Sequence, residues 1–217
     1  MLQVKVFRTQ SGFLKNLCYL IYQGHHGILI DPAWDYALID DFLTTHDIRL
    51  SAVLLTHAHR DHTDLAGRFS ESKNVPVMMS AREMEESGFS LPNLVAVHHQ
   101  RSVRTAFFQI LPYLTPGHTL GSTCYLIGNH LFSGDTIFTE GVGLCSLQNA
   151  PLLYRSVHLL KESLSPWTRV WPGHSYGEEP GKSLSFLMQN NIYFQLKEDD
   201  FIAYRTRKNQ PDPFAFR

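Results

Sequence analysis

Four side chains that can bind a metal ion stand within six residues of this sequence, directly after a short apolar run. The run Ser51–Thr56 is rich in strand-forming residues, and the segment His57–His62 (HAHRDH) follows it at once. We therefore predict a buried strand that delivers the cluster to the edge of a sheet. His57 and His59 point the same way if the backbone stays extended, whereas the later aspartate and histidine turn aside. This spacing predicts two adjacent metal sites.

Three further motifs each place one histidine or aspartate after a predicted strand and beside a glycine, which permits a tight turn. They are TPGH ending at His118, SGD ending at Asp135, and WPGH ending at His174. A lone Gly-His pair is more often a turn, but the order HxHxDH…H…D…H is hard to produce by chance. Histidine and carboxylate ligands without cysteine suit zinc, and also iron or manganese, and favour a catalytic site. The predicted ligands are His57, His59, Asp61, His62, His118, Asp135 and His174.

The rest of the chain predicts a β-rich protein with interspersed helices. The predicted strands are Leu2–Arg8, Leu17–Tyr22, Gly27–Ile30, Ser51–Thr56, Val75–Met79, Ala106–Leu114, Cys124–Ile127, His130–Ser133 and Thr168–Trp171. The predicted helices are Trp34–His46, Leu65–Glu71, Ala81–Glu86, one through Leu153, Val157, Leu160 and Leu164, and Gly181–Asn190. With 217 residues and 43% hydrophobic content, the chain can bury a sizeable core. Because no linker separates its halves, we expect one domain over residues 1–217.

The ordered set of ligand-type residues resembles the metallo-β-lactamase superfamily over nearly the whole chain. This resemblance implies an α+β fold, an αββα four-layer sandwich with a metal site along one sheet edge. It assigns His57, His59 and His118 to a first metal ion, with Asp61, His62 and His174 on a second and Asp135 bridging the two. The resemblance thus implies two zinc ions per chain. Asp61 is also expected to accept a proton from the nucleophile, so Asp61 and Asp135 are the predicted catalytic residues.

Within the superfamily, the short length and the His174-Ser175-Tyr176 run resemble the glyoxalase II branch. In that branch an aromatic residue at this place lies by the thioester, so Tyr176 is a candidate substrate contact, although a tyrosine that only covers the rim is equally consistent. A basic residue after the bridging aspartate helps to hold glutathione there. Leu144 stands at about that place, and only 43 residues follow His174, too few for the branch's additional helical domain. We therefore expect lactoylglutathione to be a poor substrate.

The C-terminal half resembles the zinc-dependent hydrolases of bacterial polyketide-synthase clusters. The resemblance lies in the segments Leu144–Ser146, Ser165–Gly181, Asn191–Phe194 and Arg205–Gln210. It implies release of stalled acyl groups from an acyl carrier protein by thioester hydrolysis. A thiol, with a pKa near ~8.5, departs without a general acid, and the motifs contain no separate acid, which favours thioesters over amides.

A small basic group could contact the carrier. Arg205, Arg207 and Lys208 could meet a phosphopantetheine phosphate or an acidic carrier helix, because arginine pairs well with phosphate. The acidic run Glu198–Asp200 lies nearby in the sequence and could instead neutralise them.

Three other functions fit parts of the pattern. Persulfide dioxygenases of the same fold hold one iron with two histidines and an aspartate, and do not need the second site. A nuclease or phosphodiesterase could use a dinuclear centre, but a formal net charge of -1 argues against nucleic acid as a partner. A non-catalytic binding protein is disfavoured because no ligand position is lost.

The sequence shows no sign of secretion or membrane insertion. The N-terminal residues lack an apolar run behind a basic head, and no run approaches the ~20 residues that cross a bilayer. The three cysteines, Cys18, Cys124 and Cys145, form no Cys-x-x-Cys pair. We expect a cytoplasmic protein with reduced thiols and no membrane partner.

Overall fold

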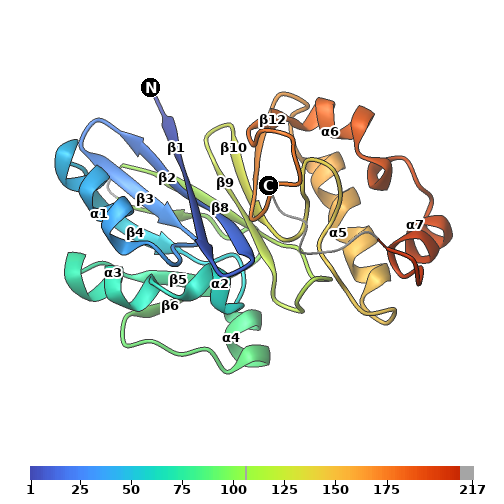
Figure 1. The fold of residues 1–217 in the computed structure, drawn as a ribbon, viewed down its shortest axis with the longest axis horizontal. Helices are drawn as coiled ribbons and strands as arrows, with labels where there is room; N and C mark the ends of the chain where they lie inside the picture. Colours follow the sequence, from blue (N-terminus) through green and yellow to red (C-terminus); the bar gives the residue numbers. More distant parts are fainter. Residues whose placement is uncertain (106, 211–217) are drawn as a thin grey trace.

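The computed structural model describes residues 1–105 and 107–210, which form two six-stranded mixed sheets packed face to face (Figure 1). The first sheet has the order β1 (Gln3–Ser11), β2 (Leu14–Gln23), β3 (His26–Ile30), β4 (Arg49–Leu54), β5 (Val77–Ser80) and β6 (Leu94–Val97). The second has the order β12 (Lys182–Ser183), β11 (Arg169–Pro172), β10 (His130–Gly134), β9 (Thr123–Ile127), β8 (Gln109–Leu114) and β7 (Val103–Arg104).

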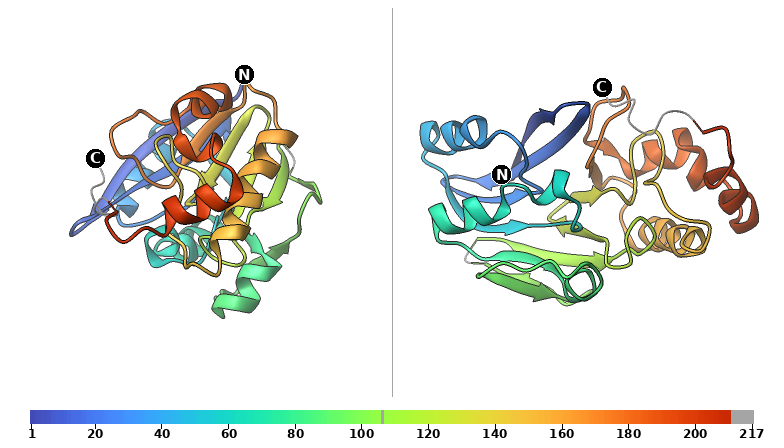
Figure 2. Two further views of the ribbon diagram at one scale, coloured as in Figure 1. Left: turned by 90° about the vertical axis from the view of Figure 1, so that its right-hand side faces the viewer. Right: turned by 60° about the horizontal axis from the view of Figure 1, so that its bottom comes forward.

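Helices cover the outer face of each sheet, as Figures 1 and 2 show. On the first sheet lie α1 (Tyr36–Thr45), α3 (Ala66–Lys73) and α4 (Ala81–Ser87), and the single turn α2 (Arg60–Thr63) precedes α3. On the second lie α5 (Ala150–Ser163), α6 (Leu184–Asn190), the 3-10 turn η1 (Ile192–Phe194) and α7 (Glu198–Arg205). The layers therefore follow the order α, β, β, α, which confirms the predicted sandwich.

The centre of the protein is an aromatic core between the two sheets. Tyr19 on β2 packs against Phe132 on β10 and Trp171 on β11, with ring centroids 5.5 and 5.7 Å apart. Tyr125 on β9 is fully buried beside them and donates its hydroxyl to the Leu55 carbonyl, 2.9 Å away. Strand β2 is buried on both faces, because its alternate residues, Cys18 among them, pack beneath the helices of the first sheet. Such strands read as continuous apolar runs.

Parallel pairing brings several strand ends to one edge of the sandwich. In the first sheet β3, β4 and β5 run parallel, and in the second sheet β10 and β11 do so. Their carboxyl ends therefore point the same way. Asp31 follows β3, His57 lies three residues after the end of β4, and Asp135 and His174 follow β10 and β11. The edge where these residues meet is where a site would form.

Most predicted elements lie within a few residues of their expected positions, but some predictions were wrong. The strand expected over Ala106–Leu114 begins only at Gln109; residue 106 lies outside the described part of the chain. The helix expected from Gly181 begins at Leu184, because residues 182 and 183 pair with β11 as an edge strand. Helix α7 was not predicted, since its acidic first turn looked like a solvated surface, yet it buries Phe201.

The cysteines and the lengths of the helices bear on the expected reduced thiols and the expected lack of a membrane span. All three cysteines are free thiols, and two of them, Cys18 and Cys124, are buried. None of the helices within residues 1–105 and 107–210 has the length and apolar character that a bilayer span requires.

We predict that the inter-sheet core dominates stability. Replacing the fully buried Phe132 by alanine should lower the free energy of unfolding by about 3–5 kcal/mol, because it removes apolar burial and leaves a cavity. Phe107, which is 53% exposed, provides a matched control, and its replacement should cost no more than about 1 kcal/mol. Urea denaturation of both variants measures the difference. Equal losses would mean that the stability does not reside in this core.

Candidate metal centre

The first group of predicted ligands presents three nitrogen atoms to one point. The Nε2 atoms of His57 and His118 each lie 3.0 Å from Nδ1 of His59. Nitrogens bound to one zinc ion at 2.0–2.1 Å in a tetrahedron stand about 3.3 Å apart. The three imidazoles are therefore arranged as a single ion requires. His59 is exposed and His57 is buried, so the group is open to solvent on the His59 side.

The second group lies beside the first and deeper in the protein. Oδ2 of Asp61 is 3.7 Å from Nε2 of His62 and 3.5 Å from Nε2 of His174. Both histidines are nearly inaccessible to solvent. All ligand atoms of this group lie within 4.8 Å of one another, as do those of the first group. The structure thus brings six of the seven predicted residues into two adjacent clusters.

Asp135, the seventh residue, stands between the two groups. Its Oδ1 is 3.4 Å from Nε2 of His62, and its Oδ2 is 3.4 Å from Nε2 of His174. The same Oδ2 lies 3.6 Å from Nε2 of His118 in the first group. A carboxylate in this position can contact an ion in either cluster, which is the geometry expected of a bridging ligand.

The second ring nitrogen of most of these histidines is held by a hydrogen-bond acceptor. Nδ1 of His118 donates to the Leu144 carbonyl at 2.8 Å, and Nδ1 of His174 donates to the Lys15 carbonyl at 2.7 Å. Nδ1 of His62 donates to a carboxylate oxygen of Asp31 at 3.0 Å. A proton fixed on Nδ1 leaves the lone pair on Nε2, aimed into the centre. The rings are therefore oriented in the form that binds metal.

Two atoms in the centre test whether a metal ion fits. His62 Nε2 and Asp135 Oδ1 are buried and accept no hydrogen bond from the described residues. The two atoms lie 3.4 Å apart. Buried polar atoms are nearly always paired, and a metal ion bound here would be a partner for both of them. The donor set, the spacing and these unpartnered atoms all fit a divalent metal ion.

The electrostatics of the centre also indicate a missing positive charge. Burial lowers the pKa of His57 well below its usual value, and the neighbouring His62 and His118 lower it further. Burial disfavours the charged form of His174 as well, but Asp135 outweighs it and raises the pKa of His174 to about 10. The carboxylates of Asp61 and Asp135 keep lowered pKa values despite their burial, because His174 and His62 face them. In the metal-free protein, protons on histidine supply the charge that these carboxylates require.

The glycines of the motifs let the backbone approach the ligands. A Cβ atom added at Gly173 would lie 2.4 Å from Oδ1 of Asp135 and 2.6 Å from Cε1 of His62. Gly134 has a φ of +49°, and a Cβ there would meet the Thr56 side chain at 2.3 Å. Residues with a Cβ do not fit at these two positions.

Two buried carboxylates connect the ligand-bearing loops by hydrogen bonds, and the sequence analysis did not identify either of them. Asp31 accepts hydrogen bonds from the amide and hydroxyl of Thr56 at 2.8 and 2.6 Å, in addition to the one from His62. Glu83, also buried, accepts from the Ala58 amide at 2.8 Å, the Thr119 hydroxyl at 2.7 Å and the Gly121 amide at 3.0 Å. Glu83 therefore joins the His57–His59 loop to the His118 loop.

A sequence signal for Asp31 existed, because it ends the apolar run of β3 just as His57 follows that of β4. Glu83 carries no such signal. It lies in the first turn of a short helix, where an exposed acidic residue is common.

The predicted substrate contacts occupy different surroundings. Tyr176 is half-buried, with its ring 5.4 Å from that of Phe138, and the Phe138 ring lies 6.0 Å from that of His174. Leu144 is 43% exposed beside the first group. Arg205, expected at the surface, is only 7% exposed and contacts Tyr193 and Gln210. Arg207 stacks on the Tyr204 ring, 3.7 Å from its centroid, and Lys208 is exposed.

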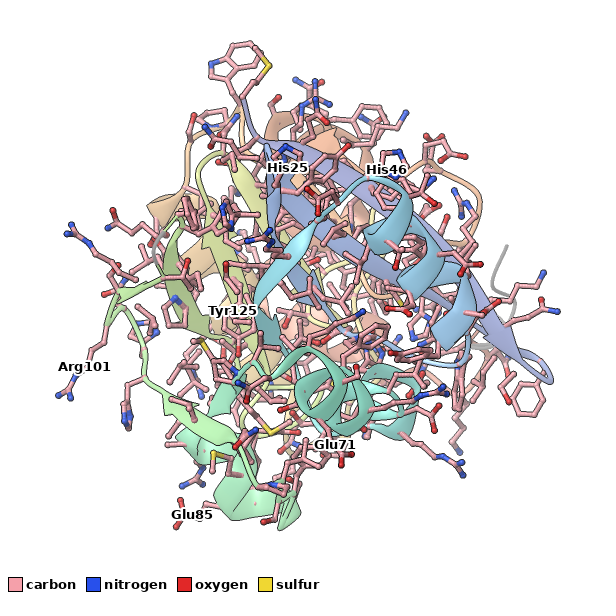
Figure 3. All side chains as sticks on the ribbon, turned by 90° about the vertical axis from the view of Figure 1, so that its left-hand side faces the viewer. His25, His46, Glu71, Glu85, Arg101 and Tyr125 are labelled. Atoms are coloured by element: carbon pink, nitrogen blue, oxygen red, sulfur yellow. The ribbon has the colours of Figure 1, made fainter. Side chains whose placement is uncertain are left out.

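The remaining histidines were expected to play no ligand role, and several of them make hydrogen bonds away from the centre. Nδ1 of His25 lies 3.0 Å from the Asp47 carbonyl, and Nδ1 of His46 lies 2.9 Å from the Phe42 carbonyl. Figure 3 shows both residues at the outer edge of the first sheet, away from the interior that Tyr125 occupies. Within the described residues, none of these histidines belongs to a group that could hold a metal ion.

Comparison with known proteins shows which family the chain resembles. A family model described as the metallo-beta-lactamase superfamily matches residues 11–174. The chain is 40% identical over 220 aligned residues to the probable polyketide biosynthesis zinc-dependent hydrolase BaeB of Bacillus velezensis, covering 99% of this chain and 98% of that one. It is 30% identical to a hydroxyacylglutathione hydrolase of Methylobacillus flagellatus, covering 82% of this chain and 68% of the relative.

A solved structure supports the same fold. The crystal structure of ETHE1 from Myxococcus xanthus matches with a TM-score of 0.82 and 29% identity, covering 96% of this chain and 93% of that one.

We predict that metal binding to the second group releases protons. Because His174 has a pKa of about 10 in the metal-free protein, it carries a proton at neutral pH that a metal ion must displace. His62 adds to this release, because Asp135 and Asp31 raise its pKa despite its burial. The apparent affinity should therefore rise at least about tenfold per pH unit between about pH 6 and 8. Asp61 and Asp135, whose pKa values are lowered, have already lost their protons there and add nothing. Calorimetry in buffers of different ionisation enthalpy counts the protons; an affinity that does not change with pH contradicts this prediction.

Proposed function

The chain belongs to the metallo-β-lactamase superfamily, and on that premise we propose that it is a metal-dependent hydrolase that cleaves thioesters. The observation that carries the proposal is the convergence of two adjacent ligand groups on Asp135. The relationship to a probable polyketide biosynthesis zinc-dependent hydrolase, over nearly the full length of both chains, supports the reaction class. Residues 1–217 then form one hydrolase domain.

The proposed cofactor is two zinc ions per chain. His57, His59 and His118 would hold one, Asp61, His62 and His174 the other, and Asp135 would bridge them. Iron or manganese suits the same nitrogen and oxygen donors. When bound, such ions lower the pKa of a coordinated water to about 7 and polarise the carbonyl under attack.

The protein's own residues would orient the reaction. Asp61 stays ionised because its pKa is lowered, so its carboxylate can accept a hydrogen bond from the attacking water and orient it. The substrate carbonyl would approach from the exposed His59 side, since His62 and His174 close the other side. The sulfur of the substrate departs as a thiolate, which needs no proton from the enzyme because a thiol has a pKa near ~8.5.

The proposed substrate is an acyl group carried on the phosphopantetheine of an acyl carrier protein. Leu144 and Tyr176 would contact the apolar part of that arm. Arg207 and Lys208 would face its phosphate or the acidic surface of the carrier. The burial of Arg205 makes it a poorer candidate for this contact than its two neighbours.

A hydroxyacylglutathione hydrolase is the second candidate, supported by relatives of that name at about a third identity. Leu144 counts against it, because this position lacks the cation expected to hold glutathione. A persulfide dioxygenase with a single iron is a third candidate. The intact second group of Asp61, His62 and His174 counts against that one.

We expect enzyme loaded with measured amounts of zinc to hydrolyse an acyl-carrier-protein thioester much faster than lactoylglutathione. His57→Ala should lower the rate by more than about a hundredfold, since even partners outside the ligand shell cost 10- to 100-fold. His25→Ala, at an exposed histidine remote from the centre, should leave the rate unchanged. Release of the free thiol, followed with a chromogenic disulfide, gives both rates.

Each other outcome identifies a different function. Faster cleavage of lactoylglutathione would mean a short hydroxyacylglutathione hydrolase. No thiol release from either substrate, with oxygen uptake on glutathione persulfide, would mean a dioxygenase.

A separate prediction concerns Leu144. Replacing it by lysine should improve kcat/KM for lactoylglutathione by about two- to fivefold, because an exposed ion pair with the glutathione carboxylate contributes up to ~1 kcal/mol. The backbone carbonyl that orients His118 remains in place in this variant. Leu144→Ala controls for the loss of the apolar side chain. If both variants change kcat/KM equally, the charge is not the determinant.

A further inference from the structure

Asp61 is held from outside the metal centre by the side chain of Asn16, a residue of β2. Nδ2 of Asn16 donates to the Asp61 carbonyl at 2.6 Å and to its Oδ2 at 3.2 Å. Asn16 is only 2% exposed, so water does not compete for these bonds. The same Oδ2 lies 3.5 Å from Nε2 of His174. The amide therefore fixes the oxygen that faces the second ligand group.

Trp34 determines which way the Asn16 amide points. Nε1 of Trp34 donates to Oδ1 of Asn16 at 2.9 Å. An indole N–H can only donate, so it can pair only with the oxygen end of the amide. The amide nitrogen is then turned toward Asp61. Without this donor, the amide could rotate by half a turn and place its oxygen against the carboxylate, where the two would repel.

The backbone at Trp34 is constrained to make this contact. Its φ is +70°, and Asp31, three residues earlier, has a φ of +49°. Such conformations are strained in residues with a side chain and persist only where the surroundings impose them. The half-buried ring packs against the core beneath the first sheet, and the guanidinium of Arg60 lies 5.9 Å from it. The strained turn thus presents the indole N–H to Asn16.

We propose that Asn16 and Trp34 form an orienting pair that aims the Asp61 carboxylate and so sets the affinity for the second metal ion. The proposal rests on the dinuclear centre proposed above. Both are positioning residues, since neither side chain reaches into the ligand clusters, and Trp34 acts through Asn16.

The pair acts on the second group alone. His57 is oriented by Thr56, and His118 by the Leu144 carbonyl, neither of which contacts Asn16 or Trp34. Glu83 fixes the loops that carry these two histidines and lies on α4. Loss of the pair should therefore leave the first ion's affinity unchanged. A general destabilisation of the fold would instead lower the affinity for both ions.

The test is a zinc or cobalt titration of the metal-free full chain, in which a competing chelator resolves the two dissociation constants. Asn16→Ala should raise the dissociation constant of the second ion roughly 10- to 100-fold, as the loss of a partner outside the ligand shell does. The dissociation constant of the first ion should not change. Trp34→Phe, which keeps an aromatic ring and removes the N–H, should also raise the dissociation constant of the second ion, but by a smaller factor. The cobalt d–d bands of the second ion should change in both variants.

A double-mutant cycle separates a positioning role from a structural one. Because Trp34 acts through Asn16, the double variant should bind the second ion no more weakly than Asn16→Ala alone. Additive losses would overturn the coupling between the two residues. Thr9→Val is the matched control, since Thr9 is the buried strand partner of Asn16 and its hydroxyl pairs with the Cys18 sulfur at 3.5 Å rather than with Asn16. It should change neither constant.

The remaining outcomes are distinguishable. If the wild-type chain binds two ions and the variants lose both equally, or lose neither, the orienting pair is refuted while the dinuclear centre stands. If the wild-type chain binds only one ion, both the pair and the dinuclear centre fail. Should Asn16→Ala not fold, as thermal unfolding would show, Trp34→Phe alone still decides the question.

Discussion

The buried carboxylate of Asp31 is the contact on which the rest of the centre depends. It accepts the amide and hydroxyl of Thr56 at the end of one strand and Nδ1 of His62 in the following turn. A buried carboxylate is costly unless its lone pairs are used, and here three donors use them. The ends of β3 and β4 and the turn α2 are thereby fixed together. Asp31 also helps to orient His57. The Thr56 hydroxyl donates its proton to Asp31, so its oxygen can accept a hydrogen bond from Nδ1 of His57, 3.0 Å away.

The two sheets contribute ligands that must meet across their interface, and the aromatic core sets that distance. Tyr19 packs between Phe132 and Trp171, and its hydroxyl donates to the Pro172 carbonyl at 2.6 Å, just before the turn to His174. The amide of Leu17 donates to the Gly173 carbonyl at 2.9 Å. Packing and hydrogen bonding therefore position the same turn. The turn also passes so close to Asp135 and His62 that a Cβ at Gly173 would have no space, which explains the motif glycine physically.

Local patterns were sufficient for most strands and for the seven residues that converge, whereas the order of the layers followed from the family resemblance. Each ligand-type residue follows a strand whose apolar run is visible in the sequence, and parallel strands end at a shared edge. Asn16, Trp34 and Glu83 could not be found this way, because their partners lie between 18 and 45 residues away in the chain. Polar residues of this kind look like ordinary surface positions until the fold brings their partners together. Helix α7 was missed for a related reason, since one buried phenylalanine among charged residues gives no clear period.

The two ligand groups are held by separate hydrogen-bond networks, and this separation has a consequence for how the centre could change. Glu83 on α4 joins the loops of the first group, whereas Asn16 on β2 reaches Asp61 in the second. Asp31 contacts both networks, because it accepts hydrogen bonds from Thr56, which precedes His57, and from His62. If the centre holds two ions, as proposed, a substitution in one network can weaken the binding of one ion without disturbing the other. Loss of a single buried amide would then lower the affinity for the second ion with every ligand residue still in place.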